Sequence, residues 1–137
     1  MLSGNESRNK PLLDLRQAVA MPESGIDADI ANQCCIYKAD ENEVCDLMGR
    51  NDITSGGSVI PYFDINGEPI QGPDDSPFVR VRLDVPLTYS DGKEAKYLSK
   101  SRSGQYPYIP PIGRDHFRSH PDDILLTEGE KKAICST

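Results

Sequence analysis

The apolar residues in the first part of the chain repeat at the spacing of α-helices. The pattern predicts three short helices, over residues 11–20, from Ser24 to Cys34, and from Asp40 to Gly49. Ser24 and Asp40 are residue types that favour the N-cap, and Gly49 favours the C-terminal stop. The apolar positions that repeat at helical spacing are Leu12, Leu15, Val19, Ile26, Ile30, Val44, Leu47 and Met48.

From Gly56 and Gly57 onward the repeat shortens to two residues, which is the period of β-strands. Strands are predicted at residues 35–37, 58–64, 68–70, 78–84 and 95–99. Asn66 and Gly67 between two of these strands form a hairpin turn signal. In the strand over 78–84, the aliphatic residues fall strictly at every second position. One face is expected to carry Phe78, Arg80, Arg82 and Asp84, and the other Val79, Val81 and Leu83.

The last part of the chain has the pattern that opens an α/β unit. Residues 123–127 form a short apolar run, as in strands that are buried on both faces of a parallel sheet. A helical turn is expected before it, over 112–117, and a helix after it, from Glu130. We therefore expect an α+β fold. Its expected divisions are a disordered tail over 1–10, a helical lead-in over 11–55 and a sheet subdomain over 56–137 that ends with the start of an incomplete α/β unit.

Charge is distributed unevenly along the 137 residues, which are enough for one domain. The net charge of −7, taken as a whole, argues against nucleic-acid binding. Residues 78–118, however, carry eight basic and four acidic side chains, a local charge of +4. The local field decides what a groove attracts, so this segment is a candidate for an anionic partner. No apolar run approaches the ~20 residues of a membrane span, and no signal-peptide pattern opens the chain, so a cytoplasmic location is expected.

The four cysteines, at 34, 35, 45 and 135, contain no Cys-x-x-Cys pair. Tetrahedral zinc needs four convergent nitrogen or sulfur ligands, usually in close pairs, so no zinc site is expected. All four side chains are expected to be reduced and mostly buried thiols.

Glu128 gives the strongest local signal for chemistry. A carboxylate at the C-terminal end of a buried parallel strand faces the crevice where α/β sheets bind ligands. There Glu128 could bind a divalent cation or transfer a proton. The alternative is a capping box, with Thr127 as the N-cap and Glu130 capping back from N3. The two interpretations are compatible, because the box leaves the Glu128 carboxylate available.

Arg80 and Arg82 form the second candidate site. They are two residues apart on one strand, so they share a face at a spacing of about 7 Å, close to that of successive phosphates. The other members of this candidate nucleic-acid site are Lys96, Tyr97 and Tyr62. The lysine would add a third cation, and either ring could stack on a base. The alternative is a solvated sheet face on which the arginines pair with Asp84.

Four short motifs follow one another in a fixed order: VIPYFDINGEPI at 59–70, VRVRLD at 79–84, KYLS at 96–99 and ILLTEGEKKA at 124–133. Four such motifs in order are more specific than any one of them. Their order and spacing are similar to those of the bacterial primase core. They resemble more closely an uncharacterised Toprim-like family of primase-like proteins from phages, plasmids and integrative elements. The resemblance covers roughly residues 24–135.

The resemblance implies a role in DNA replication or transfer, with a nucleotidyltransferase site in the complete family domain. It implies that Glu128 is the catalytic and magnesium-binding residue. It also implies that a groove for single-stranded template is lined by Arg80, Arg82, Lys96 and Tyr97. The partners it implies are single-stranded DNA or RNA, and a helicase or the remainder of a longer parent protein, with no membrane.

Toprim catalysis needs a later Asp-x-Asp to hold magnesium beside the glutamate, and none follows Glu128. We therefore expect the domain to be truncated, with an incomplete metal site, no tightly bound Mg²⁺ and no catalysis by this chain alone. A first strand and helix without the following strands leave apolar faces uncovered. Residues 124–126 and Ile134 are expected to be poorly packed or borrowed into the amino-terminal sheet.

Two other functions fit the sequence. The chain could be an enzyme whose missing carboxylates come from another polypeptide or a longer parent. It could instead be a non-catalytic protein-interaction module or an inactive remnant, with the acidic front over 11–48 as its docking surface.

Overall fold

A computed structural model describes residues 25–120, 122 and 129–135 of the chain. Several predicted features lie outside these residues: the tail over 1–10, the helix over 11–20, the Ser24 side chain, the strand over 123–127 and Glu128.

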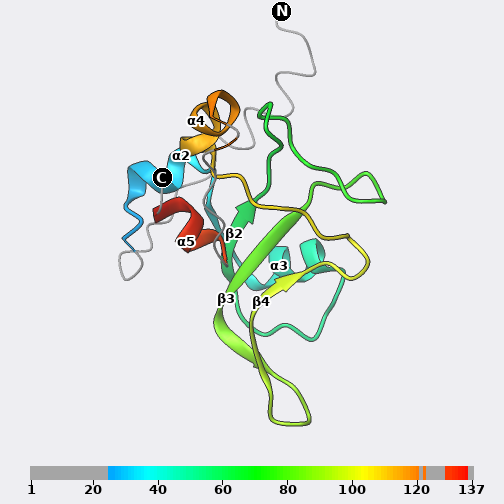
Figure 1. The fold of residues 1–137 in the computed structure, drawn as a ribbon. Coiled ribbons are helices and arrows are strands. Elements are labelled where there is room, and N and C mark those ends of the chain that lie inside the picture. The colour runs from blue at the N-terminus through cyan, green and yellow to red at the C-terminus, as the bar shows by residue number, and fades with distance from the viewer. Residues whose placement is uncertain (1–24, 121, 123–128, 136–137) are drawn as a thin grey trace, which may run out of the picture.

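A four-stranded antiparallel sheet forms the centre of the described structure (Figure 1). Its order is β1-β2-β3-β4, with bounds Tyr37–Ala39, Gly57–Pro61, Val79–Thr88 and Glu94–Ser99. The described helices are α2 (Ala28–Gln33), α3 (Glu41–Met48), the 3-10 helix η2 (Pro111–Gly113), α4 (Arg114–Ser119) and α5 (Glu130–Cys135). The predicted α+β class is confirmed, and so is the small antiparallel sheet.

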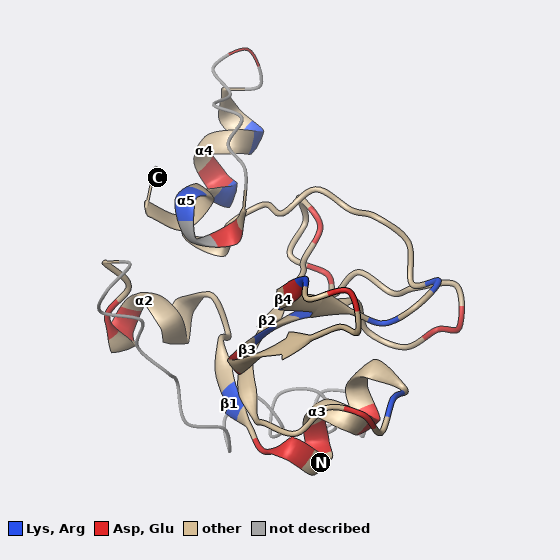
Figure 2. Ribbon diagram, turned by 90° about the horizontal axis from the view of Figure 1, so that it is seen from below, with Lys and Arg blue, Asp and Glu red and all other residues tan. Residues whose placement is uncertain are grey.

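Alternation along the strands gives the sheet two apolar faces. Val59, Val81 and Leu83 face α3, where they pack with Val44 and Met48. On the opposite face, Ile60, Tyr62 and Phe78 pack with residues of α2 and with Ile134 of α5. Figure 2 shows α3 on one side of the sheet and α4 and α5 on the other. A central strand in this arrangement is covered on both faces, which is why Val59 and Ile60 are both fully buried.

The short helices begin and end at residues with the expected capping chemistry. The Asp40 side chain accepts a hydrogen bond of 2.8 Å from the backbone N–H of Glu43, and Gly49 adopts a left-handed φ of 64° at the other end of α3. In α2 the cap is Asp27 rather than the predicted Ser24, since the Asp27 carboxylate accepts from the Ile30 N–H at 2.9 Å. The second helix therefore starts later than predicted.

The turn after β2 is organised by one carboxylate. Asp64 accepts hydrogen bonds from the backbone N–H groups of Asn66 and Glu68, at 2.8 and 3.0 Å. Gly67 has a φ of 84°, a conformation that glycine adopts without strain. The predicted hairpin turn is confirmed, and Phe63 pairs with Pro69 across it.

The lead-in segment does more than supply helices. β1 pairs with β2, with Tyr37 opposite Val59, so a strand from the segment over 11–55 is one edge of the sheet. This strand begins at Tyr37, two residues later than the predicted start, because Cys35 has a left-handed φ of 60° that interrupts extended backbone.

The structure decides two expectations about burial. Ile134 is 2% exposed and packs in the core beside Ile26 and Ile36, so of its two expected states, poor packing is wrong. Its packing on the amino-terminal part of the structure agrees with the other alternative. The cysteines are thiols as expected, but only Cys34 is buried, and Cys135 is exposed.

Gly57 in β2 leaves no room for a side chain, because a Cβ there would lie 2.6 Å from the carbonyl oxygen of Arg82. We expect Gly57→Ala to lower the free energy of unfolding by about 2–3 kcal/mol, since β2 and β3 must move apart. Gly92→Ala is the control. It adds only backbone strain, about 1 kcal/mol, because its φ is 84° and a Cβ there meets no atom within 4 Å. Urea denaturation followed by circular dichroism measures both, and equal losses would contradict the packing argument.

Candidate nucleic-acid interface

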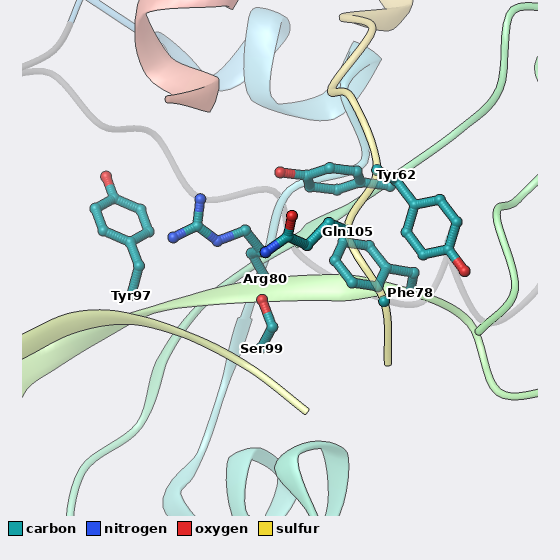
Figure 3. A pocket seen from close by; sticks show the side chains of 8 residues that line it. Tyr62, Phe78, Arg80, Tyr97, Ser99 and Gln105 are labelled. Carbon is teal, nitrogen blue, oxygen red and sulfur yellow. The ribbon is translucent and has the colours of Figure 1, made fainter. Parts of the chain in front are cut away.

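An open groove of about 390 Å³ lies on the sheet face that carries Arg80 (Figure 3). Arg80 belongs to β3, and the register places Ser99 of β4 directly opposite it. The lining residues are Tyr62, Phe78, Arg80, Tyr97, Ser99, Gly104, Gln105 and Tyr106. The groove is therefore built by β3 and β4, by the residue that follows β2, by the residue that precedes β3 and by the segment that follows β4. We call it the aromatic groove.

Aromatic rings pack edge to face along one wall of the groove. Tyr62 and Phe78 have ring centroids 4.8 Å apart with planes at 76°, and Phe78 and Tyr106 have centroids 4.8 Å apart with planes at 69°. This arrangement brings the positive edge of one ring to the negative face of the next. Gly104, with a φ of 96°, allows the Tyr106 ring to lie against the backbone, because a Cβ there would be 3.0 Å from the ring.

Arg80 forms the floor of the groove and points toward Tyr97 (Figure 3). Its guanidinium carbon lies 5.1 Å from the centroid of the Tyr97 ring, within the range of a cation–π contact. Arg82 lies directly opposite Tyr97 in the β3–β4 register, so the two arginines and the tyrosine share one face.

Glu130, the first residue of α5, is the buried charge beside this groove. Its side chain is 2% exposed, and the Tyr62 hydroxyl donates a hydrogen bond of 2.7 Å to Oε2. The same oxygen lies 3.3 Å from Nη1 of Arg80. Burial and the bond to Glu130 raise the pKa of Tyr62 above its usual value, so the tyrosine stays a donor. Two partners thus hold one carboxylate that would otherwise be costly to bury.

This contact replaces the capping role predicted for Glu130. The helix begins at Glu130 itself, directly after Gly129, so the glutamate does not occupy the N3 position that a capping box requires. Its carboxylate is turned to Tyr62 and Arg80. Sequence reasoning missed the pairing because Arg80 and Glu130 are 50 positions apart and no local pattern links them.

The predicted site residues separate into two sets. Arg80, Arg82 and Tyr97 lie on the groove face, as the register shows. Lys96 precedes Tyr97 in β4, so alternation turns its exposed side chain to the other face, that of buried Leu98. Among the described residues, Asp84 pairs with Lys38, and no arginine pairs with it. The alternative in which the arginines of the groove face pair with Asp84 is therefore wrong.

Glu128 lies outside the described residues, so its predicted catalytic and metal-binding roles stay predictions. In the part of the chain that the structure describes, no group of three or more His, Cys, Asp or Glu side chains could hold a metal ion. Within the same part, no helix has the length and apolar character to cross a membrane. No protein-family model matches the chain, and neither the curated proteins nor the solved structures include a significant match.

Cys34 and Tyr108 lie behind the aromatic wall. Tyr108 packs on Tyr62, with ring centroids 5.0 Å apart. Burial raises the pKa of the Cys34 thiol to about 11, while contact with the Tyr108 hydroxyl opposes part of that rise. Burial also raises the pKa of Tyr108 above its usual value, and Cys34 adds to this. The Cys34 thiol and the Tyr108 hydroxyl are therefore both uncharged near neutral pH, and burying an uncharged group costs less than burying a charged one.

The Glu130 contact yields a stability prediction. Glu130→Ala leaves the Tyr62 hydroxyl and Arg80 without their partner, so we expect the free energy of unfolding to fall by about 2–3 kcal/mol. Glu130→Gln keeps an acceptor for Tyr62 and is expected to lose less, about 1–2 kcal/mol. Chemical denaturation measures both, with Glu94→Ala at an exposed strand position as the control. A loss for Glu130→Ala no larger than that of the control would contradict the assignment.

The Cys34 thiol gives a prediction in pH. Because its folded pKa is raised from 9.0 to about 11, the folded state holds this proton more strongly than the unfolded state. The associated stability is complete below pH 9 and is lost as pH rises from 9 to 11. We expect Cys34→Ala to lose less stability than the wild type across that window in urea denaturation. Cys135→Ala, at an exposed position, should follow the wild-type profile. Identical profiles for the wild type and Cys34→Ala would exclude Cys34 as the source.

Proposed function

We propose that the protein binds single-stranded nucleic acid along the aromatic groove and the adjacent Arg82. The observation that carries the proposal is an open groove where the partly exposed rings of Tyr97 and Tyr106 lie near Arg80. The other two rings of the lining, Tyr62 and Phe78, are buried and support the wall from behind. Proteins that hold unpaired strands combine rings, on which bases stack, with cations that follow the backbone. Bases in a duplex are already stacked on each other, so this groove chemistry favours single strands.

The charges near the groove assign different roles to the two arginines. Arg80 is partly neutralised by Glu130 and is held over Tyr97, so it positions the groove floor. Arg82 is half-buried and takes part in no ion pair among the described residues, which leaves its charge available for a phosphate. Figure 2 shows acidic positions on α2 and α3, and basic positions on the strands of the sheet beside some acidic ones. A negative net charge is therefore compatible with anion binding at this face.

The resemblance to Toprim-like proteins of mobile elements supports a wider role for this binding in DNA replication or transfer. In that setting, the groove would hold template, and a helicase or further parts of a parent protein would be its partners. Nucleotidyl transfer at Glu128 would need an Asp-x-Asp partner for magnesium, and Glu128 lies outside the described residues. The proposal therefore concerns binding at the described groove.

Arg82 and Lys96 form a matched pair for testing the proposal, because both are cations of neighbouring strands but face opposite sides. We expect Arg82→Ala to weaken binding of a labelled single-stranded oligonucleotide about three- to tenfold at low salt. It should also make the dependence of log K on log salt shallower by about 0.7. Lys96→Ala is expected to change affinity less than twofold. Fluorescence anisotropy across a salt series measures both.

Three outcomes would count against this function. Absence of binding by the wild type at low salt removes it. Equal effects of Arg82→Ala and Lys96→Ala would show that charge alone, without the groove, attracts the strand. Tighter binding of duplex than of single strands would contradict the stacking role. Circular dichroism of each variant confirms that the fold is retained.

A further inference from the structure

We propose that the aromatic groove holds a single unpaired base of the strand and that Gln105 and Ser99 read its hydrogen-bonding edge. This deepens the proposed function and rests on it. Two neutral polar side chains line a groove whose other side chains are aromatic, apart from Arg80. Figure 3 shows the Gln105 amide beside Arg80 and the Ser99 side chain on the same face of the sheet.

The size and shape of the groove suit one base. Its volume of about 390 Å³ is near the small end of the range for small-molecule sites, roughly 300–1,000 Å³. A base is flat, with π faces for stacking and a polar rim. Tyr97 and Tyr106, the two lining rings that are not buried, supply the stacking surface, and Ser99 and Gln105 supply the polar groups.

The Arg80 cation in the groove argues against a quaternary ammonium ligand. Clusters of tyrosine and phenylalanine also bind quaternary ammonium groups. Here the Arg80 guanidinium lies inside the groove, 5.1 Å from the Tyr97 centroid, where it already fills the cation position over that ring and would repel a second positive charge. A neutral base attached to an anionic backbone fits this field, and a methylated ammonium does not.

The polar side chains differ in what they offer a base. A carboxamide presents two donors and one acceptor, and a serine hydroxyl can both donate and accept. The Gln105 side chain is exposed, and the structure records no hydrogen bond for its amide within the described residues. Arg80 is committed to Glu130 and Tyr97 instead. Gln105 is therefore the side chain best placed to distinguish one base from another.

The test uses short strands of abasic sites that carry one central base, in four versions, together with the fully abasic strand. Anisotropy with wild-type protein is expected to show a gain of about fivefold or more when one base is present. The gain should differ among the four bases by at least threefold. Gln105→Ala should reduce that difference to less than 1.5-fold while leaving the affinity for the fully abasic strand unchanged.

Gln33→Ala, an exposed glutamine of α2, is the matched control and should preserve the base differences. Ser99→Ala is the second variant, expected to reduce the differences in part. Equal binding of abasic and base-bearing strands would overturn the base site while leaving phosphate binding by Arg82 intact. A gain that is the same for all four bases and indifferent to Gln105→Ala would overturn the reading role. Failure to bind any strand, including oligothymidine, would remove the proposed function itself.

Discussion

The structure depends on one buried carboxylate. Glu130, the first residue of α5, has a side chain that is 2% exposed. Tyr62 donates a hydrogen bond to its carboxylate, and Arg80 forms an ion pair with it. Without these partners its burial would oppose the packing of α5, because an uncompensated charge is costly away from water. With them, Ile134 can enter the core and cover the sheet face opposite α3. The same contact fixes Arg80 at the floor of the aromatic groove.

The Arg80–Glu130 contact reduces the positive charge that the groove face can offer to a ligand. Residues 78–118 carry a local charge of +4, but part of the Arg80 charge is used internally, and Lys96 faces the other side of the sheet. Arg82 then carries the electrostatic part of the proposed binding, and aromatic stacking carries the rest. Affinity built in this way depends on the shape of the groove as well as on salt, since stacking is not screened by ions.

Local sequence signals predicted the elements that are stabilised locally. Asp40 and Gly49 set the two ends of α3 through their own capping and backbone preferences, and Asn66-Gly67 predicted the hairpin turn. One error was itself local, because Asp27, which caps α2 in place of the predicted Ser24, contacts the Ile30 N–H three residues on. The other arose where neighbours in space decide, because α5 starts at Glu130 with its carboxylate turned to Tyr62 and Arg80. A capping pattern in sequence cannot compete with a buried tyrosine and arginine whose positions it does not contain.

The sequence by itself determined which residues of β3 share a face, because alternation along a strand is a property of the extended backbone. It therefore identified Arg80 and Arg82 as neighbours and separated them from Val79, Val81 and Leu83. Only the tertiary structure decided what those arginines meet. The β3–β4 register placed Tyr97 beside them and turned Lys96 away, and the packing of α5 brought Glu130 to Arg80. These contacts join residues distant in the chain, so they exist only once the sheet and its covering helices have come together.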